Sequence, residues 1–362
     1  MKIAVLTGGG DCPGLNPAIR AIVKYGVKRY GHKLIGIKYG WGGFVPEAMP
    51  SRERATLDPE EIENLAARTM ELTPENVSGI LTKGGTILGS SRANPIKQEK
   101  GFDLLRQRFD ELNLDAVIAI GGEDTLTVAY EAFSQVRIPV VGIPKTIDND
   151  VFGTDTTIGF ATAYEIMTDA VDRLHSTAES HHMIHILEVM GRRAGWIALR
   201  AGIAGGADII LIPEFPLTLD ETCAYIEERR KHGKKFSIIV VAEGYPLSSG
   251  LVIQSEQKDP FGHEQLGGVG NRLANLLKEK TGFDVRVTNP AYMQRGGSAA
   301  PFDRWIATRL GIRAVDLVHN RQFGRMAAVA RNEIVDVELR EIAIGSRLIP
   351  QELFEELRWL FG

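Results

Sequence analysis

The chain opens with the stretch KIAVLTGGGDCPGLN at residues 2–16, in which an apolar run leads into a glycine-rich turn. Consecutive apolar residues at 3–6 are typical of a strand that is buried on both faces of a parallel sheet. Residues 16–30 then follow a helical pattern, for which we predict Asn16 as the N-cap and Gly31 as the terminator. A strand, a glycine turn and a helix in this order predict the first unit of an α/β fold.

The same order recurs along the chain. Alternating strands and helices predict parallel sheets with crossover helices, and a length of 362 residues favours two domains. We therefore expect two similar Rossmann-like three-layer α/β domains with mostly parallel sheets. Ligands collect at the carboxyl ends of strands in such sheets, so we expect the active site in the interdomain cleft. The further strands are predicted at residues 34–37, 116–120, 140–143, 184–189, 209–212, 238–242 and 327–330.

Composition excludes several classes of protein. Hydrophobic residues make up 44% and charged residues 24%, as in an ordinary globular protein. A formal net charge of −4 disfavours a general nucleic-acid or membrane-surface binder, because such proteins carry a basic excess. We predict no signal peptide and no bilayer-spanning segment. With only Cys12 and Cys223 as thiols, we expect a cytoplasmic protein with reduced cysteines.

Glycine is the one over-represented residue, with 39 copies. Glycine loops are found at residues 7–11, 83–92 and 121–125. The backbone N–H groups of such loops can close around an anion, although each loop alone could be an ordinary turn. The sequence has neither GxGxxG nor GxxxxGK[ST] in these loops, which disfavours a nicotinamide-dependent Rossmann enzyme and a Walker nucleotide site.

Charged side chains accompany the glycine loops. Arg92 ends the second loop, and its guanidinium can fork onto phosphate oxygens. Glu123 and Asp124 lie in the third loop, where they could bind Mg²⁺ or cap a helix.

A fourth polar segment, PKTIDND at residues 144–150, follows another predicted strand. Asp148 and Asp150 would share one side of an extended backbone, and Lys145 supplies a compact charge for a phosphate. One carboxylate could take a hydroxyl proton while positioned cations offset the charge on a moving phosphoryl group. The combination predicts phosphoryl transfer.

Together these motifs resemble those of the 6-phosphofructokinase family, in the family's order and over nearly the whole chain. The resemblance implies a homo-oligomer, a dimer or tetramer, in which neighbouring subunits share active sites. It also implies a donor domain at residues 1–159 plus 294–340 and a sugar-phosphate domain at residues 160–293 plus 341–362. The motifs are GGGDCPGLN at 8–16, GGTILGSSR at 84–92, GGEDT at 121–125, PKTIDND at 144–150, EVMGR at 188–192 and QRGGS at 294–298.

The resemblance implies roles for individual residues. Asp148 is expected to take the proton of the sugar hydroxyl, and Mg²⁺ is the expected cofactor, bound at Glu123. The other expected catalytic residues are Thr146, Asp150, Arg92 and Lys145. Donor phosphates are expected to contact Gly9, Gly10, Asp124 and Lys145. The sugar phosphate is expected to contact Thr146, Asp148, Met190, Gly191, Arg192, Glu214, Arg286, Tyr292 and Arg295.

Two positions bear on the phosphoryl donor. In members of the family that use ATP, the positions of Asp124 and Lys145 are usually glycine. An aspartate at position 124 would crowd and repel the α-phosphate of a nucleotide, whereas Lys145 can neutralise the smaller pyrophosphate. We therefore expect reversible transfer from pyrophosphate to D-fructose 6-phosphate.

Two other positions leave the acceptor open. Met183 occupies a position where the family usually has an arginine. Tyr292 occupies a position where the family often has a histidine. Loss of a charge-assisted phosphate contact costs about 1.5–3 kcal/mol if nothing compensates. The pocket is either rebuilt for the same sugar phosphate or suited to another acceptor, such as sedoheptulose 7-phosphate. An ATP-dependent enzyme of the same fold and a catalytically silent binding module are the alternatives.

Overall fold

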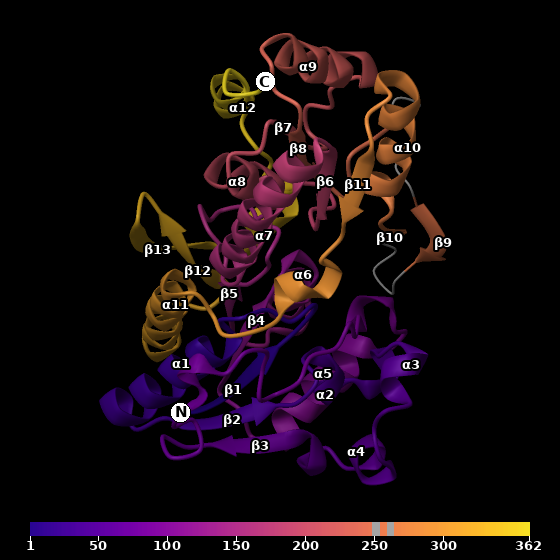
Figure 1. The fold of residues 1–362 in the computed structure, drawn as a ribbon. Coiled ribbons are helices and arrows are strands. Elements are labelled where there is room, and N and C mark those ends of the chain that lie inside the picture. The colour runs from indigo at the N-terminus through magenta and orange to yellow at the C-terminus, as the bar shows by residue number, and fades with distance from the viewer. Residues whose placement is uncertain (248–253, 259–263) are drawn as a thin grey trace.

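The computed structural model describes residues 1–247, 254–258 and 264–362. These residues form two separate, mostly parallel sheets with helices packed around them. In Figure 1 the larger sheet lies in the lower part of the molecule and the smaller sheet in the upper part. The α/β class predicted from the sequence is therefore confirmed. No helix in the described part of the chain is both long and apolar enough to span a membrane.

The large sheet has seven strands in the order β13-β12-β5-β4-β1-β2-β3. Its five inner strands are parallel, and the edge strands β3 and β13 are antiparallel to their neighbours. These strands are β1 Lys2–Thr7, β2 Lys33–Ile37, β3 Thr69–Leu72, β4 Ala116–Gly121, β5 Val140–Pro144, β12 Arg325–Ala330 and β13 Glu333–Glu338.

Alternate residues of β1 belong to two different apolar cores, one on each face of the large sheet. Ile3 and Val5 pack with α1 (Leu15–Tyr30) and α11 (Pro301–His319), whereas Ala4 and Leu6 pack with α5 (Gly101–Glu111) and α6 (Glu123–Val136). Successive side chains of a strand point to opposite faces, so helices cover both faces of this sheet. Because β1, β4 and β5 run parallel, their carboxyl ends lie at one edge of the sheet.

Helix α1 begins and ends at glycines. Gly14 is the N-cap, with φ 113°, and Gly31 is the C-cap, with φ 66°. The prediction of Gly31 is confirmed because this left-handed backbone suits glycine. The prediction that Asn16 is the N-cap is wrong. Asn16 lies inside the first turn, and its side-chain amide donates to the carbonyls of Lys83 and Gly84.

The small sheet has four parallel strands in the order β11-β6-β8-β7. Helices α7 and α8 pack together on this sheet, as do α9 and α10. These elements are β6 Ile184–Val189, β7 Ile209–Leu211, β8 Ser237–Ala242, β11 Val285–Thr288, α7 Phe160–His181, α8 Trp196–Ala204, α9 Leu219–Lys231 and α10 Val269–Thr281.

The remaining elements are short. An antiparallel pair is formed by β9 Gln254–Lys258 and β10 Glu264–Leu266. The short α-helices are α2 Trp41–Phe44, α3 Ser51–Arg54, α4 Pro59–Glu63 and α12 Gln351–Arg358. The 3₁₀ helices are Pro46–Ala48, Ala66–Arg68, Ile80–Thr82, Pro95–Lys97, Ala291–Arg295 and Leu339–Ile344.

Candidate active site

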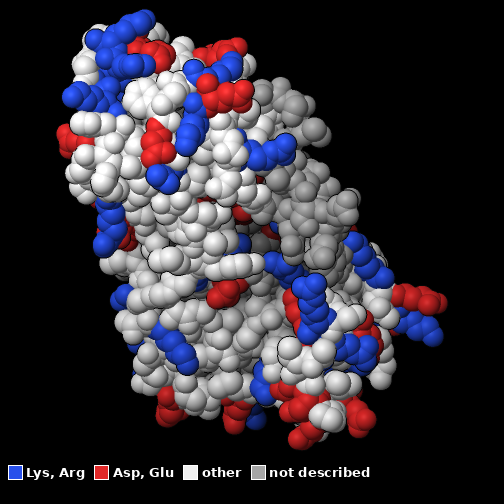
Figure 2. All heavy atoms as spheres, turned by 45° about the vertical axis from the view of Figure 1, so that its right-hand side comes forward, with Lys and Arg blue, Asp and Glu red and all other residues white. Residues whose placement is uncertain are grey.

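A charged cavity of about 160 Å³ lies where the strand ends of the two sheets face each other. Figure 2 shows basic and acidic side chains around a recess between the upper and lower parts of the molecule. The large sheet contributes the residues that follow β1, β4 and β5, and the small sheet those that follow β6 and β8. The lining residues are Gly9, Gly10, Arg92, Gly122, Glu123, Asp124, Thr125, Lys145, Thr146, Asp148, Asp150, Arg192, Arg193, Glu243 and Arg295.

The first glycine loop brings its backbone close to Arg295. A side chain at Gly10 would place its Cβ 2.6 Å from Nη1 of Arg295, so only glycine leaves the guanidinium in this position. The same guanidinium donates to the backbone carbonyl of Asp11 at 3.2 Å. Gly9 adopts φ 77°, a conformation that favours glycine. The loop can therefore approach an anion closely while Arg295 lies beside it.

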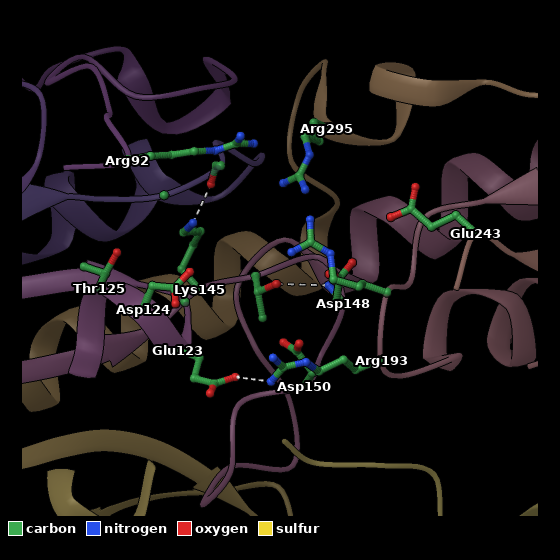
Figure 3. A pocket seen from close by; sticks show the side chains of 15 residues that line it. Arg92, Glu123, Asp124, Thr125, Lys145, Asp148, Asp150, Arg193, Glu243 and Arg295 are labelled. Carbon is green, nitrogen blue, oxygen red and sulfur yellow. Dashed lines mark hydrogen bonds and ion pairs between the residues drawn. The ribbon is translucent and has the colours of Figure 1, made fainter. Parts of the chain in front are cut away.

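Lys145 is the buried cation of the cavity. Its side chain is only 2% exposed, and Nζ donates to the carbonyl oxygen of Gly10. Burial lowers the pKa of Lys145, so an anion bound beside it would favour its charged form. Asp124 lines the same side of the cavity from the first turn of α6, whose N-cap is Gly122. Figure 3 shows Lys145, Asp124 and Arg92 on one side of the cavity.

The catalytic loop, residues 146–150, brings two carboxylates into the cavity without being fully extended. Asn149 adopts φ 54°, and the extended backbone considered from the sequence is therefore wrong at this residue. The Asn149 side-chain oxygen accepts from the backbone N–H of Thr157 at 3.0 Å. The left-handed turn is thus held by its own side chain, and both Asp148 and Asp150 still line the cavity.

Asp148 lies at the centre of the cavity, with Arg295 on one side (Figure 3). Its backbone N–H donates to Oγ1 of Thr146 at 3.2 Å. Oδ1 of Asp148 is buried and has no hydrogen-bond partner in the described part of the chain. Burial raises the pKa of this carboxyl, while Arg295 and Arg192 oppose the rise. A raised pKa with an open acceptor atom is suited to a general base.

Two further carboxylates, those of Asp150 and Glu123, line the cavity. Burial raises the pKa of Asp150 to about 7, and the negative charges of Asp148 and Glu123 add to the rise. Glu123 pairs with Arg193 at 3.7 Å. The described residues contain no cluster of three or more acidic, histidine or cysteine ligands. Two oxygen donors beside a phosphate site still fit Mg²⁺, because this ion retains several waters and is completed by substrate phosphates.

The small sheet contributes Arg192, Arg193 and Glu243 to the cavity. Glu243, which was not predicted, directly follows β8, and burial raises its pKa to about 7. The charge of Asp148 adds to this rise, whereas Arg192 opposes it. An acidic residue directly after an apolar strand is the signal that could have identified Glu243.

Five expected acceptor residues do not line this cavity. The backbone N–H of Met190 donates to the side-chain oxygen of Gln294 at 3.0 Å. Gly191, the next residue, has a φ of 140°. Arg286 is exposed and pairs with Asp284 at 2.9 Å. Tyr292 is 74% exposed and lines a neighbouring, more open cavity together with Arg92 and Arg295.

Glu214, which is expected to contact the sugar phosphate, is the fifth of these residues and does not line the cavity. Its carboxylate accepts from the backbone N–H groups of Gly195 and Ile349, each at 3.1 Å. Gly195 lies two positions after the cavity residue Arg193, and Ile349 belongs to the C-terminal segment. The structure therefore gives Glu214 a bridging position behind the site.

Parallel strand ends, glycine loops, arginines and buried carboxylates around one cavity define a protein built to bind and transfer phosphoryl groups. The phosphofructokinase family model matches residues 2–318, and the chain belongs to this family.

Full-length relatives in this family carry two kinds of name. A Streptomyces coelicolor protein named pyrophosphate–fructose 6-phosphate 1-phosphotransferase is 45% identical, with 100% of both chains covered. A Mycobacterium leprae protein named ATP-dependent 6-phosphofructokinase is 41% identical, again over 100% of both chains. The identities to these two relatives differ by only a few per cent, so overall identity does not distinguish pyrophosphate from ATP as the donor.

The fold is also found in a solved structure. Phosphofructokinase from Pichia pastoris, in the T-state, superposes with a TM-score of 0.81 at 30% identity, covering 99% of this chain. The match spans 39% of the fungal chain, which is therefore much longer than this one.

Proposed function

We propose that this chain moves a phosphoryl group from pyrophosphate to the 1-hydroxyl of D-fructose 6-phosphate, giving fructose 1,6-bisphosphate and phosphate. The observation that carries the proposal is that Lys145 and Asp124 both line the donor side of the cavity. The buried ammonium offers charge to the compact pyrophosphate anion, while the carboxylate repels a longer nucleotide phosphate chain. The name of the Streptomyces relative agrees with this donor.

Asp148 is the general base in this proposal. Its Oδ1 has no partner among the described residues, so it can accept the hydroxyl proton directly. As the proton moves to Oδ1, the hydroxyl oxygen attacks the phosphorus and the bond to the leaving phosphate breaks. Thr146, whose Oγ1 accepts from the N–H of Asp148, fixes the loop during this step.

Cations around the cavity stabilise the moving phosphoryl group. Arg92 and Lys145 lie on the donor side, and Arg295 approaches from the segment after β11 (Figure 3). Their charges are held in place before the reaction, which is the main source of stabilisation in phosphoryl transfer. Gly9 and Gly10 leave room for donor oxygens beside them. Arg192 lies on the acceptor side, where it is suited to the sugar phosphate.

Glu123, with Asp150 beside it, is the proposed site for Mg²⁺. When bound, this ion offsets negative charge on the phosphate oxygens. Glu123 also forms an ion pair with Arg193 at 3.7 Å, which holds its carboxylate at the edge of the cavity.

The acceptor side is completed by a second subunit in this proposal. Arg286 lies outside its own cavity, and its side chain is exposed on the edge strand β11, which suits a contact with the sugar phosphate of a neighbour. Met190, Gly191 and Tyr292 would approach the sugar when it binds. A homo-oligomer with shared sites, a dimer or tetramer, follows from this assignment.

We also propose the division into a donor domain, residues 1–159 plus 294–340, and a sugar-phosphate domain, residues 160–293 plus 341–362. Sheet membership supports it, because the large sheet uses residues 2–144 and 325–338 and the small sheet uses residues 184–288. Ile342, just beyond the proposed boundary, still packs in the core of the large sheet. Cys12 and Cys223 are free, which supports the proposed cytoplasmic location.

The test is an assay of the purified chain with pyrophosphate and fructose 6-phosphate, in both directions, with Mg²⁺ present. We expect fructose 1,6-bisphosphate and phosphate in equal amounts, and slower turnover when ATP replaces pyrophosphate. Parallel reactions with sedoheptulose 7-phosphate measure acceptor preference. Absence of turnover with pyrophosphate in either direction would falsify the proposal.

A further inference from the structure

The segment that follows the last 3₁₀ helix runs along the rear of the catalytic cavity. We call residues 346–349 the C-terminal strap. At one end of the strap, Ser346 forms an antiparallel bridge with Val151, the residue directly after the catalytic loop. Its other end is held by Glu214, which accepts the backbone N–H of Ile349 at 3.1 Å. The strap therefore connects segments that belong to different sheets.

Arg347 contacts the catalytic loop from this strap. Its backbone N–H donates to the carbonyl of Asp150 at 2.8 Å, and Nη1 donates to the carbonyl of Asn149 at 3.4 Å. Both carbonyls flank the left-handed turn at Asn149, with φ 54°. This turn sets the direction in which the neighbouring carboxylates leave the backbone. A displacement of Arg347 would thus be transmitted to Asp148 and Asp150.

The same arginine contacts the acceptor side of the cavity through Trp196. Its guanidinium carbon lies 4.2 Å from the centroid of the Trp196 ring. Nε1 of Trp196 in turn donates to the carbonyl oxygen of Arg347 at 3.0 Å. Trp196 is 2% exposed and is the first residue of α8, three positions after Arg193 in the cavity wall. A cation over a desolvated indole is a favourable contact, so it can hold the strap.

We propose that Arg347 and Trp196 are positioning residues that hold the catalytic loop in register with the acceptor side of the cavity. Neither residue lines the cavity, so neither is proposed to touch a substrate. Their effect would pass through the backbone of Asn149 and Asp150 to the Asp148 base. Misplacement of a reacting group by about 1 Å can cost about 100-fold in rate, which makes small movements of this loop measurable.

The proposal rests on the proposed function, and the wild-type assay separates the two. If the wild-type chain shows no turnover with pyrophosphate, the proposed function fails. If the wild-type chain turns over, the variant Arg347→Ala tests the strap. We expect its kcat to fall about 10- to 100-fold, while KM for pyrophosphate and for fructose 6-phosphate changes less than about threefold. Arg347→Lys keeps a cation over the indole and should retain most of the activity.

Trp196→Phe examines the same contact from the other side, and also serves if Arg347→Ala does not fold. It keeps an aromatic ring but removes the Nε1 donor, so a fall of about 3- to 10-fold in kcat is expected. The double variant should be no slower than Arg347→Ala alone, because both changes remove one contact. Arg340→Ala is the matched control. Arg340 is exposed and pairs only with Glu338 among the described residues. Its replacement by alanine should leave kcat unchanged.

Three results would overturn the proposal. The first is a kcat of the folded Arg347→Ala chain within twofold of wild type. The second is a loss expressed in KM with kcat unchanged, which would mean that Arg347 acts in binding. The third is a lower melting temperature with unchanged kcat per folded molecule, as for a residue with a purely structural role.

Discussion

The donor side and the acceptor side of the cavity differ in how completely one chain builds them. Every donor residue expected from the sequence, Gly9, Gly10, Asp124 and Lys145, lines the cavity. On the acceptor side, Arg192 and Arg295 line it with the catalytic loop, whereas Arg286 and Tyr292 do not. The donor half is thus preformed, and the acceptor half depends on groups that lie elsewhere in this chain.

The difference follows from topology. Strands β1, β4 and β5 are adjacent and parallel, so their carboxyl ends place three loops within reach of one phosphate. Two expected acceptor residues that lie outside the cavity come from edge strand β11 and the segment after it. Arg286 lies within β11 rather than at its carboxyl end, and Tyr292 is 74% exposed on the 3₁₀ helix that follows. Parallel pairing therefore fixes the donor geometry, while the acceptor geometry needs further contacts.

The largest effect is expected where the two sides meet. Asp148→Asn removes the proposed base but keeps the shape of the side chain. We expect kcat to fall by about 10²- to 10⁴-fold, because general base catalysis contributes about that factor. Binding of fructose 6-phosphate, measured by calorimetry, should change little. Asp220→Asn, an exposed aspartate paired with Lys280, is the control and should be fully active.

A fall of less than tenfold in the folded Asp148→Asn chain would contradict the assignment of the base. The donor and acceptor sides would then have to meet at another carboxylate, and Asp150 would be the next candidate.

An intermediate effect is expected at the incomplete acceptor side. Arg286→Ala should raise KM for fructose 6-phosphate about 10- to 100-fold, as for loss of a charge-assisted contact, and leave KM for pyrophosphate unchanged. Mixing Arg286→Ala chains with Asp148→Asn chains under exchange conditions should restore part of the activity. Such hybrids contain sites in which an intact Asp148 faces an intact Arg286.

Two results would contradict a shared acceptor site. If Arg286→Ala binds fructose 6-phosphate normally, or if mixed chains recover no activity, the subunits do not share the acceptor site through this arginine. The acceptor side would then be complete within one chain.

A smaller effect is expected on stability, through Glu243 on the acceptor side. Its pKa is about 7 in the folded chain, against an ordinary value of 4.5, so the folded state binds more protons than the unfolded state between these values. Wild-type stability should therefore fall as pH rises through this window. Glu243→Gln removes this loss, so the melting temperature of the variant relative to wild type should increase from pH 5 to pH 8. A constant difference across this range would show that Glu243 is not held with a raised pKa.

Much of the fold could be predicted from the sequence, because long apolar strands such as β4 and β6 are buried on both faces and leave an unambiguous pattern. Edge strands such as β3 and β13 were not predicted, since each is partly exposed and its pattern is weak. The helix start at Gly14 was missed because the Asn16 side chain is used in a contact with residues 83–84. That contact joins segments far apart in the chain.

The residues of the candidate site likewise fall into those that the sequence could predict and those that depend on contacts distant in the chain. Residues directly after strands, such as Lys145 and Asp148, were predicted because their place follows from sheet topology. Glu214 also follows a strand, but it is drawn to backbone N–H groups of Gly195 and Ile349, and the partner at 349 is 135 positions away. Local pattern cannot anticipate such a pairing. The strap contact between Arg347 and Trp196 was missed for the same reason.

The central claim is that Lys145 and Asp124 select pyrophosphate as the donor. The most direct test is the ratio of kcat/KM for pyrophosphate to kcat/KM for ATP, measured with fructose 6-phosphate for the wild-type chain and for the double variant Asp124→Gly with Lys145→Gly. We predict a wild-type ratio above about 100 and a fall of at least about tenfold in the variant, equivalent to about 1.4 kcal/mol in relative transition-state stabilisation. A wild-type chain that uses ATP as well as pyrophosphate, or a ratio unchanged by the double substitution, would contradict the claim.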